Sequence, residues 1–138
     1  PALAESLNTP PLEVHLARDF MLVYACQKDV EQFDVDRTLF DRTSLGTGGV
    51  IVTAPGDNCD FVSRFFTPQA TILEDPVTGS AHCTLAPYWG ARLGKPVMQA
   101  QQLSARRGTL RCEVKEDHVQ VSGQATTYLE GTVHLNQT

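Results

Sequence analysis

The residue types best suited to chemistry lie in one short stretch, Glu74-Asp75-Pro76-Val77-Thr78-Gly79-Ser80-Ala81-His82. Two carboxylates, a proline-fixed turn and a Gly-Ser step come directly before an apolar run with helical spacing at residues 81–93. Such a turn directs backbone N–H groups and a hydroxyl toward one point, with the positive end of a helix dipole behind it. A substrate carboxylate can bind there with Asp75 beside it, which is typical of an acid/base site for a small molecule.

Each side chain of this stretch also has a structural interpretation. An Asp-Pro pair such as Asp75-Pro76 often begins a turn, whereas a carboxylate at a positive helix end stays ionised and suits a proton acceptor. Thr78 and Ser80 can cap the helix or contact a ligand. Gly79 lets a ligand approach the backbone or relieves turn strain. His82 is an acid/base residue by type, and equally a packed or hydrogen-bonded histidine.

The elements that must position this stretch are mostly strands. Alternating or β-branched apolar residues predict strands at 12–18, 20–25, 49–54, 60–66, 99–106, 109–115, 119–121, 123–129 and 132–135. An irregular lead-in is expected at residues 1–11, and short helical turns at 28–33 and 36–40. The outline is one α+β domain over residues 1–138, with many antiparallel strands around one main helix.

The helix predicted at residues 81–93 is the main apolar segment. Its apolar residues lie on more than one side, so we expect it to be largely buried, with Tyr88 and Trp89 in the core. Pro87 predicts a bend and Gly94 the end of the helix. Arg64, which precedes a pair of phenylalanines on a predicted strand, is expected in an ion pair rather than in a ligand contact.

Composition excludes several classes of function. The net charge of −5 argues against nucleic-acid binding, and the cluster of Arg106, Arg107 and Arg111 is interpreted as a solvated face. No apolar run approaches the roughly 20 residues of a membrane span. The cysteines form no C-x-x-C pair, so we expect no zinc and free thiols in a reducing compartment, the cytoplasm; they are Cys26, Cys59, Cys83 and Cys112.

Taken in order, these motifs resemble the C-terminal half of the phenazine-biosynthesis (PhzF-like) isomerase family, relatives of the diaminopimelate epimerase fold. The resemblance covers roughly residues 45–135. The matching segments are 49–54, 64–68, 74–82, 88–89, Gln102-Leu103-Ser104-Ala105-Arg106 and 129–132. One departure concerns the hairpin: the family continues with two glycines, whereas this chain has Arg107 and then Gly108.

The resemblance implies a curled antiparallel sheet wrapped around one central helix, with a second half facing it and the substrate between two helix N-termini. It implies that Asp75, Gly79 and Ser80 face that cleft. The family's principal catalytic glutamate and a Gly-His motif belong to the N-terminal half, and nothing in this chain matches them. Glu74 and Glu130 match C-terminal positions and are not that base.

The resulting hypothesis is half of a cofactor-independent isomerase that moves a proton on a small carboxylate-bearing substrate. Asp75 is its catalytic residue, and the expected substrate contacts are Thr78, Gly79, Ser80 and His82. We expect no cofactor and no metal, and an inactive chain without a second half, supplied by an N-terminal half or by a second copy in a homodimer. The alternatives are a non-catalytic module that binds a small anion or a partner, and a racemase that uses an accessible Cys83 with a lowered thiol pKa.

Overall fold

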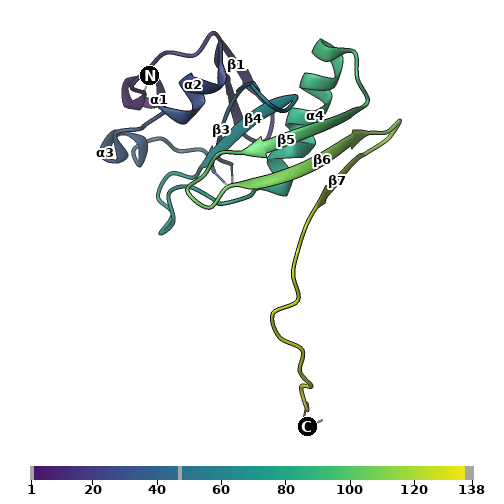
Figure 1. Ribbon diagram of the computed structural model, residues 1–138. Helices are drawn as coiled ribbons and strands as arrows, with labels where there is room; N and C mark the ends of the chain where they lie inside the picture. The colour runs from purple at the N-terminus through teal and green to yellow at the C-terminus, as the bar shows by residue number, and fades with distance from the viewer. Residues whose placement is uncertain (1, 47, 136–138) are drawn as a thin grey trace.

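The strands of the chain lie in one sheet in their sequence order, β1 to β7 (Figure 1). The computed structural model describes residues 2–46 and 48–135. The strands are β1 (Glu13–Leu16), β2 (Phe20–Val23), β3 (Val50–Pro55), β4 (Phe61–Phe66), β5 (Val97–Gln102), β6 (Gly108–Val114) and β7 (Val119–Gly123). The helices are α1 (Ala2–Ser6), α2 (Gln27–Glu31), α3 (Arg37–Phe40) and α4 (Gly79–Leu93).

The α+β class is confirmed, but the sheet is mixed rather than antiparallel throughout. β2 pairs with β3, and β4 with β5, in parallel. In both cases the chain passes through helices between the two strands, α2 and α3 in the first case and α4 in the second. Such a crossover carries the chain back to the end of the sheet where the preceding strand began, so the next strand runs parallel. The other four pairings are antiparallel.

The middle of the sheet is buried on both faces. Val50 and Val52 pack with α2 and α3, whereas Ile51 between them packs with α4, because successive strand residues point to opposite faces. β3 therefore does not alternate but is apolar at most positions, with the buried Thr53 as its one polar residue, as is usual for a strand covered on both sides. Trp89 lies in the core, and Tyr88 is partly buried beside it, as predicted.

Helix α4 is covered on one side only. Its buried residues, Ala81, His82, Leu85, Ala86 and Trp89, form one face, and its exposed residues include Ser80, Cys83, Pro87 and Ala91. The expectation of a helix buried on several sides is thus wrong within this chain, because one sheet face can cover only one side of a helix. The predicted end is confirmed, since Gly94 adopts the left-handed conformation at φ 64°.

The two ends of the chain also differ from expectation. Residues 2–6 form helix α1, where an irregular segment was expected. Residues 124–135, here called the tail, form no strand and extend away from the sheet (Figure 1). Strands were predicted at 123–129 and 132–135, but a strand needs a neighbour for its backbone hydrogen bonds, and no described segment pairs with the tail.

Candidate functional site

Residues 74–78 run back along the end of β4 before α4 begins. The Asp75 N–H donates to the Phe65 carbonyl at 3.0 Å, and Glu74 forms an isolated bridge with Phe66. This pairing holds the start of the motif against the sheet. Asp75 is therefore placed between the end of a strand and the start of a helix, as the sequence pattern predicted.

Glu74 belongs to a structural ion pair. The Arg64 Nε and Nη2 atoms lie 2.6 and 3.0 Å from the two Glu74 carboxylate oxygens. Arg64 Nη1 also donates to the carbonyls of Val30 and Phe33 at 3.2 and 2.7 Å. The expected ion pair of Arg64 is confirmed, and Glu74 is occupied by it.

Thr78 occupies the N-cap position of α4 without capping the helix. Its hydroxyl instead donates to Asp75 Oδ2 at 2.5 Å, and no side chain of the described residues caps the first turn. The first N–H groups of α4 consequently keep their capacity to bind an anion. Thr78 itself is only 7% exposed, so it orients Asp75 and has little surface for a ligand.

Arg18, which the sequence did not single out, lies at the same helix end. Its Nη2 donates to Ser80 Oγ at 3.1 Å and to Asp19 Oδ2 at 2.8 Å. The Asp19 carboxylate is buried, and its Oδ1 accepts the Gly49 N–H at 2.8 Å. Because Ser80 accepts from Arg18, its own hydroxyl proton stays available for an acceptor. Ser80 is separated from Arg18 by 62 residues, and no local pattern signals that contact.

Gly79 has no steric reason to be glycine within this chain. A Cβ built at this position meets no atom within 4 Å, and φ lies outside the left-handed region. The turn-strain interpretation is therefore not supported by the backbone. The space above Gly79 is open, as close approach of a ligand requires.

His82 lies in the core and away from the exposed helix end. Its side chain is 0% exposed, and its ring centroid lies 5.9 Å from that of Phe61. Nδ1 lies 2.8 Å from the Thr78 carbonyl oxygen, which only accepts, so Nδ1 carries the proton and Nε2 has no partner. Burial lowers the pKa of His82 below its ordinary value of 6.5. In this conformation His82 has no surface with which to contact a substrate.

Because the imidazole of His82 is buried and neutral, we expect the stability of the fold to depend on pH. Above pH 6.5 the imidazole of His82 is neutral in both the folded and the unfolded chain. Below pH 6.5 the unfolded chain binds a proton at this residue and the folded chain does not, so the free energy of unfolding decreases as the pH falls. We expect the free energy of unfolding in urea to be about 1 kcal/mol lower at pH 5.5 than at pH 7.5. His82→Asn, which keeps an N–H donor, should remove this difference. An equal pH dependence in both proteins would contradict the prediction.

Some classes of site are absent from the part of the chain that the structure describes. No group of three or more His, Cys, Asp or Glu side chains there could hold a metal ion. None of the described helices is long and apolar enough to cross a membrane. All four cysteines are free, and Cys83 is exposed on α4, where its Sγ lies 3.8 Å from the Gly79 carbonyl oxygen.

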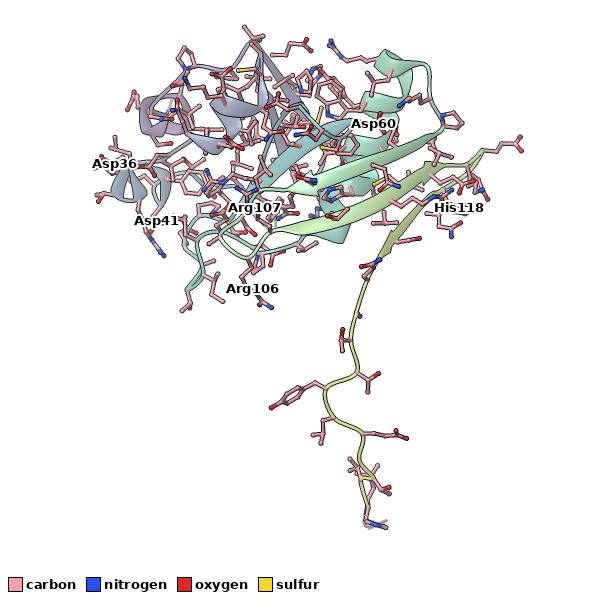
Figure 2. The ribbon with its side chains drawn as sticks, in the orientation of Figure 1. Asp36, Asp41, Asp60, Arg106, Arg107 and His118 are labelled. Atoms are coloured by element: carbon pink, nitrogen blue, oxygen red, sulfur yellow. The ribbon has the colours of Figure 1, made fainter. Side chains whose placement is uncertain are left out.

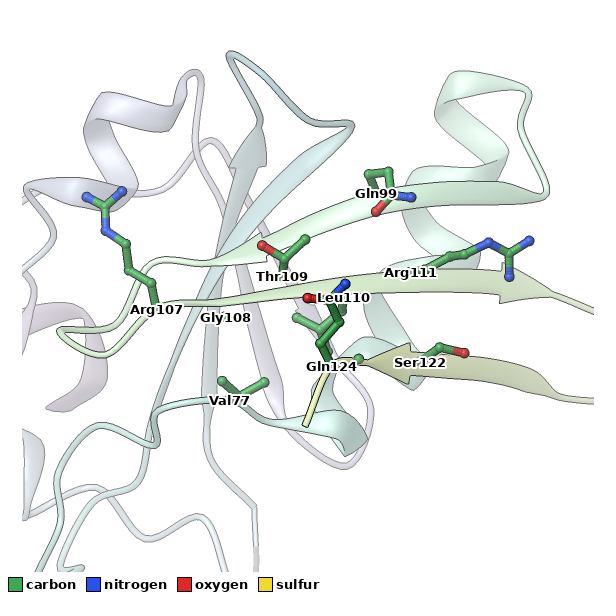
Figure 3. Close-up of a pocket in the computed structure, with 10 residues that line it drawn as sticks. Val77, Gln99, Arg107, Gly108, Thr109, Leu110, Arg111, Ser122 and Gln124 are labelled. Atoms are coloured by element: carbon green, nitrogen blue, oxygen red, sulfur yellow. The ribbon is translucent and has the colours of Figure 1, made fainter. Parts of the chain in front are cut away.

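An open groove of about 750 Å³ lies along β5, β6 and the end of β7 (Figure 3). Its lining includes Val77 but no other residue of the 74–82 motif. Figure 3 shows the Arg107 side chain extending away from Val77 and Gln124. Arg106 and Arg107 are exposed in the β5–β6 turn (Figure 2), and Arg111 pairs with Glu113 at 2.9 Å, as expected of a solvated face. Of the motif, this groove therefore borders an apolar side chain and none of the polar ones.

Most of the chain, including the 74–82 motif, is similar to known proteins. The family model described as phenazine biosynthesis-like protein matches residues 10–131. An uncharacterized isomerase of Pseudomonas aeruginosa is 44% identical over 134 residues, which are 96% of this chain and 51% of that protein.

Two solved structures are similar over nearly the whole chain. A crystal structure of a phenazine biosynthesis protein of the PhzF family from Enterococcus faecalis matches with a TM-score of 0.86 and 44% identity, covering 98% of this chain and 52% of that one. A putative phenazine biosynthesis PhzC/PhzF protein from Clostridium difficile matches with a TM-score of 0.84 and 38% identity, covering 97% and 50%. The chain therefore spans about half the length of the relatives it matches.

Proposed function

Because the chain belongs to the phenazine biosynthesis-like family, whose relatives include proteins named as isomerases, we propose that it forms half of a cofactor-independent isomerase. The reaction is proton transfer on a small substrate that carries a carboxylate. Asp75 exchanges the proton with the substrate, and the start of α4 binds the carboxylate. The four thiols, none of them in a disulfide, support a reducing compartment such as the cytoplasm.

The observation that carries this proposal is the uncapped start of α4. A helix end without a side-chain cap, with a free hydroxyl proton on Ser80 and the Arg18 guanidinium beside it, is a site for an anion. Asp75 is held next to this end by Thr78. An anchored carboxylate and a fixed proton acceptor are the two parts that such an isomerisation needs from this half.

Substitution of Gly79 provides a direct test of ligand binding at the start of α4. Gly79→Ala should leave the fold intact and raise the stability by about 0.5 kcal/mol, because alanine is the better helix former. The added methyl group would fill the open space that the ligand needs. We expect benzoate to bind the wild type weakly and to shift the amide NMR signals of residues 79–81. It should bind the variant at least about tenfold more weakly.

Two controls make this experiment specific. Gly131→Ala, in the tail, also has open space around it and should leave benzoate binding unchanged. Benzamide, which has the shape of benzoate without its charge, should not shift these signals in either protein. Equal benzoate binding by wild type and Gly79→Ala would contradict the proposed carboxylate position.

The second half of the site must come from outside the described chain, and we propose a homodimer when the chain is alone. The tail supports this assembly: Tyr128, Leu129, Val133 and Leu135 are all more than 80% exposed. Strand β1 at the sheet edge also exposes apolar side chains, including Val14 and Leu16, and an open edge can pair with a strand of another copy.

Light scattering at tens of micromolar tests the homodimer. The wild type should have twice the 15.1 kDa mass of the chain. A variant that ends at residue 123 should be monomeric, because it lacks the exposed tail. A monomeric wild type would contradict the homodimer and favour an N-terminal half as the partner.

A further inference from the structure

Gln102, at the end of β5, is a fully buried amide whose polar atoms all bind one loop. Its side chain is 0% exposed. Oε1 accepts the Thr78 N–H at 2.8 Å, and Nε2 donates to the Asp75 carbonyl at 2.7 Å and to Thr78 Oγ1 at 3.2 Å. Burial of an amide without hydrogen-bond partners costs several kcal/mol. The hydrogen bonds to this loop therefore account for a glutamine at this buried position, where core packing alone would favour an apolar side chain.

The chemistry of the partners fixes the orientation of this amide. The Thr78 N–H can only donate and the Asp75 carbonyl can only accept, so Oε1 must face the first and Nε2 the second. Nε2 is then also the donor toward Thr78 Oγ1. The hydroxyl has one proton, and with its oxygen accepting from Gln102 that proton points to Asp75 Oδ2. The hydrogen bonds therefore run in one direction, from Gln102 through Thr78 to Asp75.

The next polar residue of the same segment holds the loop at a second point. Ser104 Oγ donates to the Pro76 carbonyl at 2.7 Å and accepts the Arg107 N–H at 3.1 Å. Gly108 completes this contact, because a Cβ there would lie 2.4 Å from a methyl group of Val77. The β5–β6 segment thus braces the main chain of residues 75–78, and Gln102 alone also reaches a side chain that orients the carboxylate.

We propose that Gln102 is a positioning residue that sets the direction of the Thr78 hydroxyl and thereby the orientation of the Asp75 carboxylate. The proposal rests on the proposed function for its catalytic meaning, since Asp75 is the proton-transfer group there. The orientation itself is a property of this chain alone. It can therefore be measured without a substrate or a second half.

The test is an NMR comparison of variants of the full chain, with the side-chain carboxyl ¹³C resonance of Asp75 as the signal. Thr78→Val removes the hydroxyl donor, and Gln102→Met removes the amide at similar volume. Both should move the Asp75 signal in the same direction, and the double variant should move it no further than Thr78→Val alone. Gln99→Met, at an exposed position of β5, should leave it in place.

Each outcome decides the proposal. An Asp75 signal that moves in Thr78→Val and stays in Gln102→Met would show that Gln102 braces the backbone only. A signal unchanged in both would show that Asp75 and Thr78 are not bonded in solution. Should Gln102→Met fail to fold, Gln102→Glu replaces it, because its carboxylate accepts from the Thr78 hydroxyl and should move the signal in the same way.

Kinetics of the two-half enzyme then separate this proposal from the proposed function. Loss of orientation should lower kcat about tenfold with KM within about twofold, because the carboxylate acts in the transition state and not in substrate binding. A moved Asp75 signal with an unchanged kcat would leave the positioning by Gln102 intact and overturn the catalytic role of Asp75.

Discussion

Asp75→Asn should lower the turnover of the proposed two-half isomerase by about 10²- to 10⁴-fold, the usual effect of removing an acid/base group. The substitution keeps the shape of the side chain and removes its charge and its capacity to take up a proton. Turnover can be followed as incorporation of deuterium from D₂O into the substrate, because a moved proton exchanges with solvent. Thermal unfolding should stay close to that of the wild type, since Asp75 is partly exposed and not in an ion pair.

The matched control is Asp36→Asn, an exposed carboxylate that caps α3 by accepting the Leu39 N–H. It removes the same charge far from the motif and should leave turnover unchanged. Wild-type turnover by Asp75→Asn at saturating substrate would exclude a chemical role for Asp75 and leave anion binding as the function of this half.

Arg64→Met should lower the free energy of unfolding by about 3 kcal/mol, because it leaves a mostly buried carboxylate without its partner. The side chains of Arg64 and Glu74 are only 15% and 20% exposed, and the carbonyls of Val30 and Phe33 would lose a donor as well. Urea unfolding measures the change, and the midpoint of thermal unfolding should fall by about 10 °C in a chain of this size.

Two further variants identify the cause. Glu74→Gln in the Arg64→Met background should recover part of the loss, since it removes the unpaired charge. Arg111→Met breaks a more exposed pair with Glu113 and should leave the unfolding midpoint nearly unchanged. A loss of less than about 1 kcal/mol in Arg64→Met would show that water replaces the guanidinium at no great cost.

The start of the site could be predicted from sequence, because its signals are local. A proline-fixed turn and a Gly-Ser step before an apolar run placed Asp75, Thr78 and Ser80 at a helix end, and the structure has them there. Helix geometry argues against His82 as a substrate contact. His82 follows Ser80 by two positions, which on an α-helix is a rotation of about 200°, so the two side chains point to opposite sides.

Contacts between distant segments could not be predicted in this way. Arg18 meets Ser80 only because the β1–β2 turn and the start of α4 lie at one end of the sheet. Gln102 lies in a strand whose alternation indicates only that it faces inward, and the loop that it binds comes 24 residues earlier. Arg107, which departs from the family pattern, adopts φ 55° at the turn between β5 and β6, a conformation that favours glycine.

In the proposed assembly, the tail also determines whether association stops at two copies of the chain. If two copies exchange residues 124–135 reciprocally, each tail binds the other copy and no binding surface stays free, so the assembly is limited to a pair. One-way exchange, in which each copy passes its tail to the next, closes into a ring only if the rotation between copies allows it, and otherwise leaves a free tail at one end and a free β1 edge at the other. An open series of this kind grows into a filament, so under the proposed tail exchange the exposed tail is also a surface that favours polymerisation at high concentration.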